Sequence, residues 1–486
     1  MAGLSPWPSL ARGAKLVTRT PGPLVPPTCL RRCSQLAHQV DRPLVSLGSR
    51  IALTIAGAVA ALAVAITLMR GGLVRSSGEP IRVGVLHSLT GPMASSEVPV
   101  VNAIRMAADE INARGGLLGR RIELLVRDGK SDPETFAAEA ERLVAEDRVS
   151  VIFGCWTSAS RRTVRPVIER LKGLMIYPVQ YEGVESSPHL VYAGAAPNQQ
   201  IVPAVQWLFS RGVRRVALVG SDYVFPHVAN AIIRDLVASL GGTVVIERYI
   251  PLAGGGEDAA ARAIADARPD VILNTVNGDA NRTLMRALRS CGVEPGRTPV
   301  MSFSIAEPQI AAWGPEAFVG DFVAATYFES MPTPASRSFA RALRSHHGDS
   351  ARASDAVESA YTAFMLWAQG VEDAGTAEPM AVRSAMSGLF TVGPAGIAIV
   401  DAATGHLWRS ARIGEVMPDG SIRVVWESGA PIRPMPYPLW RSRRDWDRFL
   451  AEMRTAWGGS WSSPGDVAAP RPHWERASLP SGGGAP

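Results

Sequence analysis

Two polar stretches carry the residues best suited to holding a small ligand. Residues 153–162 (FGCWTSASRR) combine an indole with hydroxyl groups, and residues 177–183 (YPVQYEG) add phenols, an amide and a carboxylate. Each begins where a short apolar run ends, at 149–153 and at 174–177. In an open α/β sheet this is the carboxyl end of a strand, where ligands collect. The two stretches therefore predict a small polar pocket with flat aromatic walls.

The residues after the first apolar run also favour a helix start. Thr157, Ser158 and Ser160 carry hydroxyl groups that cap helices well, and we expect the helix to run to about Arg170. Backbone N–H groups at a helix start have no partner within the helix, so they bind a carbonyl oxygen or an anion. Ser158 is therefore either a ligand donor or a simple helix cap.

A second set of polar and aromatic side chains follows later apolar runs. Tyr223 and Phe225 follow one run, Asn277 and Asp279 follow another, and Glu307 lies in the loop after a third. A carboxylate accepts an N–H group more strongly than a neutral acceptor does. Asp279 is equally well placed to cap the helix that follows it.

Catalytic and cofactor motifs are missing from the sequence. Cys155 lies beside hydroxyl residues, but no Cys-Glu-Lys or Ser-Ser-Lys constellation accompanies it. His87 is the only histidine near an expected strand end, and we expect it to pack beneath the cleft. No Gly-x-Gly-x-x-Gly follows a strand and no metal-ligand pair has helical spacing. We expect no enzyme, no cofactor and no metal, and we expect Cys155 and Cys291 to be buried small apolar residues.

From Ile81 onward, apolar runs alternate with stretches of helical periodicity. This alternation predicts an α/β fold with parallel, doubly wound sheets covered by helices on both faces. The expected strands are 81–87, 122–126, 149–153, 174–177, 215–219, 243–249, 271–274, 299–302 and 322–327. The expected helices are 98–113, 133–146, 157–170, 199–210, 226–240, 257–267 and 280–290.

Helical sequence then returns, and short strands close the fold. The later helices are 335–347, 355–374 and 381–387, and the later strands are 396–400, 410–416 and 421–426. Asp355 and Glu358 suit the exposed start of a helix. This order indicates two lobes joined by several chain crossings, with a ligand cleft between them. Lobe 1 is expected to contain residues 81–197 plus 330–393, and lobe 2 residues 198–329 plus 394–435.

The start of the chain reads as a membrane anchor. Residues 51–69 carry no charge and are long enough to span a bilayer as one helix. Basic residues in the Pro-rich leader 1–50 place that leader in the cytoplasm and the remainder outside, at the cell membrane. A cleaved signal segment and a start codon downstream of Met1 are the alternatives. Cys29 and Cys33 in the leader have no second pair, so a zinc site is not expected.

The C-terminal tail, residues 436–486, contains one amphipathic stretch. Apolar residues recur there on one helix face, with arginines among the polar positions. The apolar residues are Trp446, Phe449, Leu450, Met453 and Trp457. The helix either packs on the lobes or lies on the membrane surface. Residues 462–486 are rich in Pro, Gly and Ser, which is typical of disorder.

Composition and charge are those of an ordinary globular protein. The chain of 486 residues is 47% hydrophobic and 19% charged, with a formal net charge of +6. The excess of basic residues lies in the leader and in the tail, and no basic stripe runs through the middle of the chain. Nucleic acid is therefore not an expected partner.

Residues 81 to about 435 resemble the substrate-binding proteins of ABC transporters for urea and short-chain amides. Matching segments occur in both expected lobes and in the expected order. They are residues 83–91, 154–158, 177–183, 196–200, 219–226 and 274–279. Some relatives in this family sense amides in the cytoplasm, but Trp156 and the pair Val179-Gln180 resemble the urea-type receptors more. The tail from about Trp440 lies outside the resemblance.

The resemblance implies a type I periplasmic-binding fold that captures urea, acetamide or formamide and delivers it to the permease subunits of an ABC transporter. Ser158 would donate to the ligand carbonyl, with Trp156 and Tyr177 as walls from lobe 1 and Tyr223 and Phe225 closing from lobe 2. The remaining expected polar contacts are Gln180, Asn277, Asp279 and Glu307. A membrane-tethered amide sensor that signals through a partner, or a branched-chain amino acid receptor, is the alternative.

Overall fold

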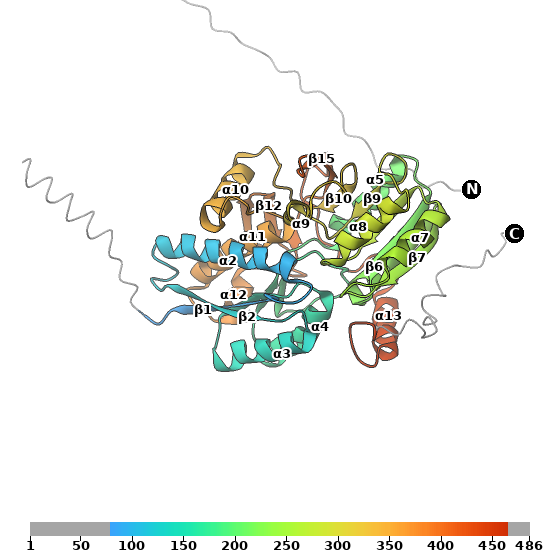
Figure 1. The fold of residues 1–486 in the computed structure, drawn as a ribbon. Coiled ribbons are helices and arrows are strands. Elements are labelled where there is room, and N and C mark those ends of the chain that lie inside the picture. The colour runs from blue at the N-terminus through green and yellow to red at the C-terminus, as the bar shows by residue number, and fades with distance from the viewer. Residues whose placement is uncertain (1–77, 465–486) are drawn as a thin grey trace, which may run out of the picture. The chain divides into compact units, whose positions relative to one another are not determined.

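Residues 78–464 are described by the structure, which is a computed structural model of the chain. They form two lobes, each built on its own β-sheet and flanked by helices (Figure 1). Within each sheet the strands that alternate with helices along the chain are parallel. The α/β fold with two lobes and mainly parallel sheets, as expected from the alternating pattern, is therefore confirmed.

Lobe 1 contains a five-stranded parallel sheet in the order β2-β1-β3-β4-β5. Its strands are β1 (Ile81–His87), β2 (Ile122–Asp128), β3 (Val151–Gly154), β4 (Met175–Tyr177) and β5 (Leu190–Tyr192). Its helices are α2 (Ala94–Ala113), α3 (Pro133–Glu141), the π-helix η1 (Arg142–Glu146), α4 (Ser158–Arg170), α11 (Asp355–Ala374) and α12 (Pro379–Ala385). Helices α2 and α11 pack together, as do α3 and α4, so both faces of the sheet are covered.

Lobe 2 contains a seven-stranded sheet in the order β15-β14-β10-β9-β8-β6-β7. Its strands are β6 (Arg215–Ser221), β7 (Thr243–Ile250), β8 (Val271–Thr275), β9 (Val300–Ser302), β10 (Phe322–Ala325), β14 (Arg412–Val416) and β15 (Ile422–Glu427). Its helices are η2 (Pro197–Gln199), α5 (Ile201–Ser210), α6 (Val224–Ser239), α7 (Glu257–Ala267), α8 (Ala280–Ser290) and α9 (Glu307–Trp313). Strands β14 and β15 are antiparallel and close one edge of the sheet.

The strand order places a switch point between two inner strands of each sheet. In lobe 1 the chain turns to opposite sides of the sheet between β1 and β3, and in lobe 2 between β6 and β8. Ligands of open α/β sheets bind at the carboxyl ends of strands at such points. Trp156 follows β3, Tyr223 follows β6 and Asn277 follows β8. Sheet topology therefore places these three predicted site residues where ligands of such sheets bind.

A small antiparallel sheet lies beside lobe 1. It contains β11 (Phe390–Gly393), β12 (Gly396–Val400) and β13 (Leu407–Trp408), and β11 packs against α11. His406 forms an isolated bridge with Tyr192 at the end of β5. Strand β12, which the expected boundaries assign to lobe 2, thus pairs with strands on the lobe 1 side, and the chain returns to the lobe 2 sheet at β14. Helix α10 (Pro334–His347) packs on α2.

The tail helix α13 (Arg443–Ala456) packs on lobe 2. Its apolar face is buried in a cluster that also includes residues of α5 and α6. Trp446 is fully buried, and its indole N–H donates to the carbonyl of Pro438 at 3.1 Å. Arg441 fixes the approach to the helix with two hydrogen bonds to Asp235 of α6. The expectation of a helix packed on the lobes is confirmed, and a membrane-surface role for this face is wrong because the face is already covered.

The membrane anchor predicted at residues 51–69, and the leader before it, lie outside the described residues. Among residues 78–464, no helix combines the length and the apolar character needed to cross a bilayer.

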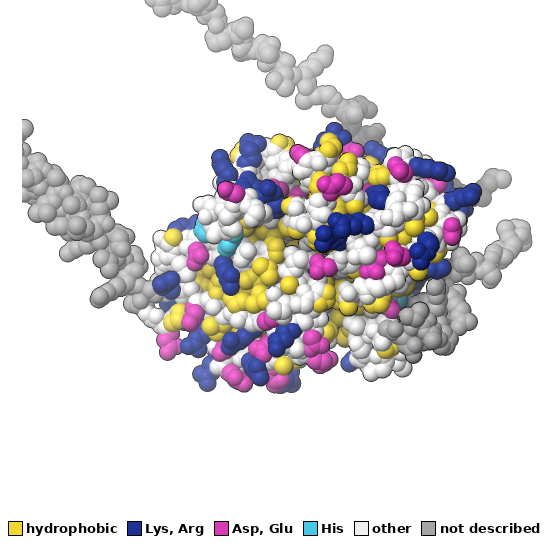
Figure 2. Space-filling model, in the orientation of Figure 1, with side chains coloured by type: hydrophobic (Ala, Val, Ile, Leu, Met, Phe, Trp, Pro, Cys, Tyr) yellow, Lys and Arg dark blue, Asp and Glu magenta, His cyan; other side chains and the backbone are white. Residues whose placement is uncertain are grey.

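On the face drawn in Figure 2, basic and acidic side chains are interspersed. That face gives no support to nucleic-acid binding.

Replacing Trp446 by alanine tests the docking of the tail. We expect Trp446→Ala to lower the free energy of unfolding by about 3–5 kcal/mol, because it leaves a large cavity beneath α13. The measurement is guanidinium chloride unfolding of the full chain. Trp440→Ala is the control, since Trp440 is 37% exposed and its loss should change stability by no more than about 0.5 kcal/mol. Equal effects of the two substitutions would contradict the docking.

Candidate functional site

The two lobes meet directly at the strand ends that were expected to hold a ligand. The indole N–H of Trp156 lies 3.4 Å from the Asn277 side-chain oxygen of lobe 2. Gln180 donates its amide N–H to the carbonyl of Phe303 at 3.0 Å. Gln180 also donates to the hydroxyl of Ser304 at 3.2 Å. Trp156 and Gln180 belong to lobe 1, Asn277 and Ser304 belong to lobe 2, and all four side chains are buried or half-buried. The lobes are therefore in a closed arrangement, with predicted site residues on both sides of the contact.

One small cavity lies at this contact, next to the chain crossings. Its volume open to the centre of a water molecule is about 20 Å³. A cavity of this size holds about one water molecule. The polar residues that line it are Gln180, Gln200, Ser304, Glu307, Gln309, Ser354 and Asp355, and its aromatic residues are Trp156, Phe303, Tyr327 and Phe328. Three of the predicted site residues, Trp156, Gln180 and Glu307, thus share one cavity.

Glu307 has the most unusual environment in this cavity. It is 5% exposed at the start of α9, and one carboxylate oxygen accepts the backbone N–H of Glu329 at 2.8 Å. Its other oxygen has no hydrogen-bond partner among the described residues. Burial raises the pKa of Glu307 to about 8, and the nearby charges of Glu329 and Asp355 add to that rise. Glu307 therefore has one uncommitted oxygen, which accepts a hydrogen bond when the carboxyl group is ionised, at a helix start that was expected to be a loop.

Gln309 and Asp355 extend the set of acceptors. The side-chain oxygen of Gln309 has no hydrogen-bond partner among the described residues, while its amide N–H donates across the cleft to Ser96 of α2 at 3.2 Å. Asp355 is 7% exposed, and burial raises its pKa, with Arg409 opposing that rise. Asp355 and Glu358 were expected at an exposed helix start. That expectation is wrong, because the start of α11 is buried under the crossing that contains Thr326.

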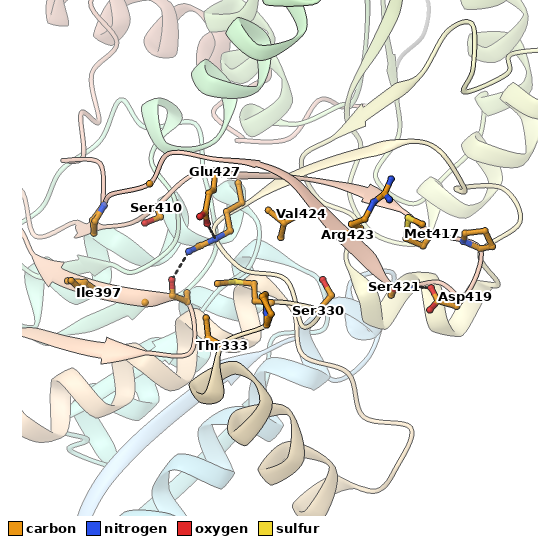
Figure 3. A pocket seen from close by; sticks show the side chains of 18 residues that line it. Ser330, Thr333, Ile397, Ser410, Met417, Asp419, Ser421, Arg423, Val424 and Glu427 are labelled. Carbon is orange, nitrogen blue, oxygen red and sulfur yellow. Dashed lines mark hydrogen bonds and ion pairs between the residues drawn. The ribbon is translucent and has the colours of Figure 1, made fainter. Parts of the chain in front are cut away.

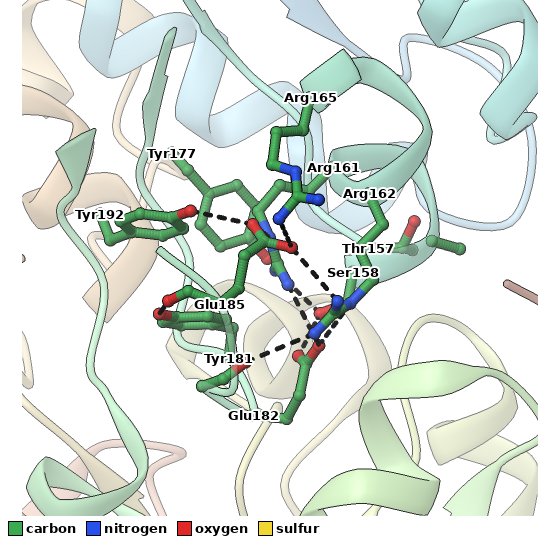
Figure 4. A network of polar contacts seen from close by, with 12 residues as sticks. Thr157, Ser158, Arg161, Arg162, Arg165, Tyr177, Tyr181, Glu182, Glu185 and Tyr192 are labelled. Atoms are coloured by element: carbon green, nitrogen blue, oxygen red, sulfur yellow. Dashed lines mark hydrogen bonds and ion pairs between the residues drawn. The ribbon is translucent and has the colours of Figure 1, made fainter. Parts of the chain in front are cut away.

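Ser158 lies in a buried charged network of lobe 1 (Figure 4). Its hydroxyl donates to Glu182 at 2.5 Å and accepts from Arg161 at 2.9 Å. Thr157, and not Ser158, caps α4, by accepting the N–H of Ser160. Ser158 is 1% exposed and does not line the cavity. In the closed arrangement its hydroxyl thus forms its hydrogen bonds within lobe 1 and donates to no described residue outside it.

The charged network joins α4 to the segment after β4. Arg161 donates to Glu182 at 3.1 Å and to Glu185 at 3.0 Å, and Arg162 binds Glu182 through two nitrogens. Burial would raise the pKa of Glu185, but the charges of Arg161, Arg162 and Arg165 outweigh it and lower the pKa to about 2. The same pairing raises the pKa of Arg161 although burial acts in the opposite direction. Both partners are ionised, so the network is a rigid polar core.

Tyr177 belongs to this core and not to the cavity wall. Its hydroxyl donates to the carbonyl of Trp156 at 2.5 Å, and the Arg161 guanidinium lies 4.7 Å from its ring centre. It is fully buried. Its contact fixes the backbone of the residue whose indole does line the cavity. Cys155, one residue earlier, has a φ of +68° and helps to turn that indole out of the strand.

Tyr223 and Phe225 lie at the start of α6, on the lobe 2 side of the contact. Both are buried, at 2% and 3% exposure, and their ring centres are 6.2 Å apart. Tyr223 also pairs with Ser462 of the tail through an isolated bridge. Neither lines the small cavity. Their expected role in closing on a ligand stays a prediction.

Asp279 lies at the rim of the contact. It is the N-cap residue of α8 but forms no side-chain capping bond. Instead its carboxylate accepts the hydroxyl of Ser95, in lobe 1, at 2.8 Å. The capping interpretation is wrong, and Asp279 is a polar link between the lobes.

Residues that suggested catalysis are buried in inert surroundings. Cys155 is fully buried, and burial raises the pKa of its thiol, which keeps it protonated and a poor nucleophile. Cys291 is half-buried. His87 is fully buried and lies 2.9 Å from Glu97. Among residues 78–464, no group of three or more His, Cys, Asp or Glu side chains is arranged to hold a metal ion.

A much larger hollow lies elsewhere, between the start of α10, the β11–β12 turn and the β14–β15 turn (Figure 3). Its volume is about 1020 Å³, and none of the predicted site residues lines it. Its charged side chains are already engaged: Arg412 lies 3.4 Å from Glu427, and Arg423 lies 2.6 Å from Glu415. Size alone therefore does not favour it over the cleft, where buried acceptors remain unpartnered.

Comparison with known proteins identifies the fold. The family model described as "Periplasmic binding protein domain" matches residues 81–443, which is most of the chain. The chain belongs to the periplasmic binding protein family. The matched family is one of binding proteins, so the family supports a binding role for residues 81–443.

Curated relatives cover most of the chain at low identity. The chain is 24% identical over 353 residues to the Leu/Ile/Val-binding protein BraC3 of Rhizobium johnstonii, covering 68% of this chain and 93% of that protein. It is also 24% identical to the Leu/Ile/Val-binding protein homolog 6 of Brucella melitensis, covering 69% and 87%. These names describe the relatives, and at this identity ligand preference does not transfer.

Solved structures share the fold. A solute-binding protein of an ABC transporter from Rhodopseudomonas palustris HaA2, in complex with p-hydroxybenzoic acid, has a TM-score of 0.68 at 23% identity and covers 74% of this chain and 99% of that one. The branched-chain amino acid binding protein LivJ from Streptococcus pneumoniae, in complex with isoleucine, has a TM-score of 0.63 at 19% identity and covers 71% and 99%. The two-lobed binding fold is thereby established, while the ligand is not.

Sequence reasoning missed several residues that line the cavity. Gln200, Phe303 and Gln309 were not candidates, although Gln200 lies in one of the resembling segments and donates to the carbonyls of Phe303 and Ala324. Helix α9, which places Glu307 and Gln309, was missed because its seven residues are too short for a clear helical period. The Glu-Pro pair at its start was the available signal, since proline favours the first helical turn.

Stability should depend on pH through Glu307. Its folded pKa of about 8 lies above the ordinary glutamate pKa of 4.5, so the neutral form is favoured on folding. The stabilisation by the neutral form is fully present below pH 4.5 and is lost as the pH rises through about 8. The free energy of unfolding falls by at most about 5 kcal/mol over this range. Burial also raises the pKa of Asp321, to about 7, and the pKa of Asp355, so the wild-type curve contains all three effects.

The Glu307→Gln variant isolates the contribution of Glu307. We expect its stability in guanidinium chloride unfolding to fall less than that of the wild type between pH 5 and pH 9. Glu294→Gln, at an exposed loop position, should follow the wild-type curve. Parallel curves for wild type and Glu307→Gln would contradict a raised pKa at this residue.

Proposed function

We propose that this protein captures urea or a short-chain amide such as acetamide or formamide in the cleft between its lobes. The proposal is carried by the cavity at the lobe contact, which is small, aromatic-walled and provided with unpartnered buried acceptors. Membership of the periplasmic binding protein family supports delivery of the ligand to the permease subunits of an ABC transporter. The resemblance of residues 154–158 and 177–183 to urea-type receptors supports the same ligand class.

The size of the closed cavity favours a very small ligand. About 20 Å³ is open to water centres when the lobes are closed, so every added heavy atom has to be accommodated by separating the lobes. Leucine and aromatic acids have more than twice as many heavy atoms as urea. Urea has four, and at about 1.5 kcal/mol per atom its binding is limited to about 6 kcal/mol. That corresponds to a dissociation constant of some tens of micromolar.

The charge of the cavity favours a neutral ligand that donates N–H groups. Glu307 and Asp355 line it, and none of the described residues in its wall is Lys or Arg. A ligand carboxylate would meet acidic side chains instead of the cationic partner it requires. Urea and amides carry N–H groups that match Glu307 and Gln309, the two cavity-lining residues with an unpartnered side-chain oxygen. The Trp156 indole N–H, held only by a 3.4 Å contact, is available to the ligand carbonyl.

Two alternatives remain distinct from this proposal. A branched-chain amino acid receptor is favoured by the names of the relatives, and it requires an anchor for the amino acid carboxylate. A membrane-tethered amide sensor would use the same ligand but a different partner. We propose transport over sensing because residues 81–443 match the family described as periplasmic binding proteins.

We further propose that the ligand-binding lobes lie outside the cytoplasm and are held at the cell membrane by residues 51–69. The support is the uncharged stretch of sequence and the basic leader before it. Such a tether would keep the receptor near its permease. Protease accessibility of intact cells tests this orientation.

Ligand selectivity tests the proposal directly. In isothermal titration of the full chain at pH 8.5, urea or one of the short amides should bind with a dissociation constant of tens of micromolar. Leucine, isoleucine and p-hydroxybenzoate should give no heat of binding at the same concentrations. Binding of leucine alone would contradict the proposal and favour the amino acid receptor. Release of ammonia from urea by the pure protein would contradict a purely binding role.

The pH dependence of affinity tests the contact with Glu307. If a ligand N–H donates to the Glu307 carboxylate, binding requires loss of the proton that this group holds below about pH 8. Affinity should then rise with pH by up to about tenfold per unit and level off above pH 8. Asp355, Glu329 and Tyr327 also interact with Glu307 and shift the midpoint.

Variants separate the contribution of Glu307 to the pH dependence of affinity from the contributions of the neighbouring groups. Glu307→Gln should bind more weakly at pH 9 and show a flat profile, whereas Glu294→Gln should keep the wild-type profile. An affinity that falls as the pH rises would mean that the protonated carboxyl donates to the ligand, which contradicts the proposed contact.

A further inference from the structure

The last described residues run along the lobe 2 side of the cleft. The N–H of Val224 donates to the carbonyl of Trp461 at 3.0 Å, and the N–H of Ser463 donates to the carbonyl of Asp222 at 3.1 Å. Between them, Ser462 forms a bridge with Tyr223. The tail thus pairs, strand-like, with the turn that presents Tyr223. This turn lies between β6 and α6, at the switch point of the lobe 2 sheet.

The same segment reaches the opposite lobe through one side chain. Two guanidinium groups lie over the indole ring of Trp461. Arg162 of α4 lies 5.1 Å from the ring centre and Arg454 of α13 lies 5.3 Å from it. Arg162 is 6% exposed and is held by Glu182 in the charged core of lobe 1. Trp461 is therefore attached by its backbone to lobe 2 and by its ring to a rigid group of lobe 1.

The tail makes a second contact with lobe 1 before α13 begins. The N–H of Val184 donates to the carbonyl of Pro436 at 2.7 Å. Gly183, with a φ of +72°, allows this approach, because a Cβ there would lie 2.1 Å from the same carbonyl. Between the two lobe 1 contacts, Arg441 and α13 hold the tail to lobe 2. Residues 436–463 thus connect the lobes at two points outside the chain crossings.

We propose that residues 457–463 act as a clasp across the cleft, in which Trp461 is a positioning residue that holds Tyr223 and stabilises the closed arrangement through Arg162. The inference rests on the proposed function, since it assigns a role in retaining the ligand of the same site. Opening of the lobes separates Arg162 from the backbone that carries Trp461. The indole–guanidinium contact therefore contributes to closure and does not contribute to the fold of either lobe alone.

The expected effect is on ligand release. A contact that exists only in the closed arrangement raises apparent affinity by increasing the population of the binding-competent form. Loss of a desolvated cation–π contact corresponds to roughly a tenfold change. The Trp461→Ala variant should therefore release ligand on the order of ten times faster, with little change in the association rate. Trp461→Phe keeps a ring over Arg162 and should restore part of the difference.

Stopped-flow measurements on the full chain, with the amide that binds in isothermal titration, provide the test. Trp440→Ala is the matched control, because it removes a tryptophan of the same tail that is 37% exposed, and it should leave the release rate unchanged. Unchanged release in Trp461→Ala, or equal acceleration in Trp461→Phe and Trp461→Ala, would overturn the clasp. Wild-type protein that binds none of the amides would overturn the proposed function instead.

Hydrogen exchange of the ligand-free chain tests the clasp independently of any ligand. In Trp461→Ala, the backbone amides of residues 182–185 in lobe 1 and 222–224 in lobe 2 should both exchange several-fold faster than in the wild type. Faster exchange confined to 222–224 would show a structural role within lobe 2 alone and would overturn the proposal.

Discussion

A group of ionised side chains sealed inside lobe 1 determines how the first half of the site is built. Arg161 and Arg162 from α4 are paired with Glu182 and Glu185 from the segment after β4, and none of the four is more than 6% exposed. Such a network is not by itself a strong source of stability, because removing charges from water offsets most of their attraction. Its effect is to permit one geometry, since any other would leave a buried charge unpaired.

That single geometry explains why lobe 1 presents an indole to the cleft. Glu182 also holds Ser158, and Tyr177 is held by Arg161 and in turn binds the carbonyl of Trp156. The polar groups of Ser158 and Tyr177 thus bind other groups of lobe 1 and are not free for a ligand. Trp156 and Gln180 are lobe 1 side chains that contact lobe 2. A rigid lobe 1 surface allows the second lobe to close on a defined shape, as selective binding of a very small ligand requires.

Lobe 2 and the tail complete the site in different ways. Helix α9 brings Glu307 and Gln309 to the cavity, and the crossing after β10 buries Asp355 beside them. Acceptors are therefore supplied where the lobes hinge, while Tyr223 and the tail lie at another part of the contact. A ligand held in the cleft would thus be recognised near the crossings and retained by contacts farther from them.

The sequence by itself determined the fold and the neighbourhood of the site. Alternating apolar runs and helical periods predicted β1, α7, α8 and α11 at their observed bounds, because local periodicity and capping are properties of the sequence alone. The ends of the expected strands also identified Trp156, Gln180 and Glu307 as site residues.

Only the tertiary structure decided which polar groups remain free for a ligand. Ser158 and Tyr177 are engaged by Arg161 and by the Trp156 backbone, and Asp355 is buried by a crossing from the other lobe. Whether a polar side chain is partnered depends on groups distant in sequence, and this is why spacing alone did not identify Gln200, Gln309 or the approach of Trp461 to Arg162.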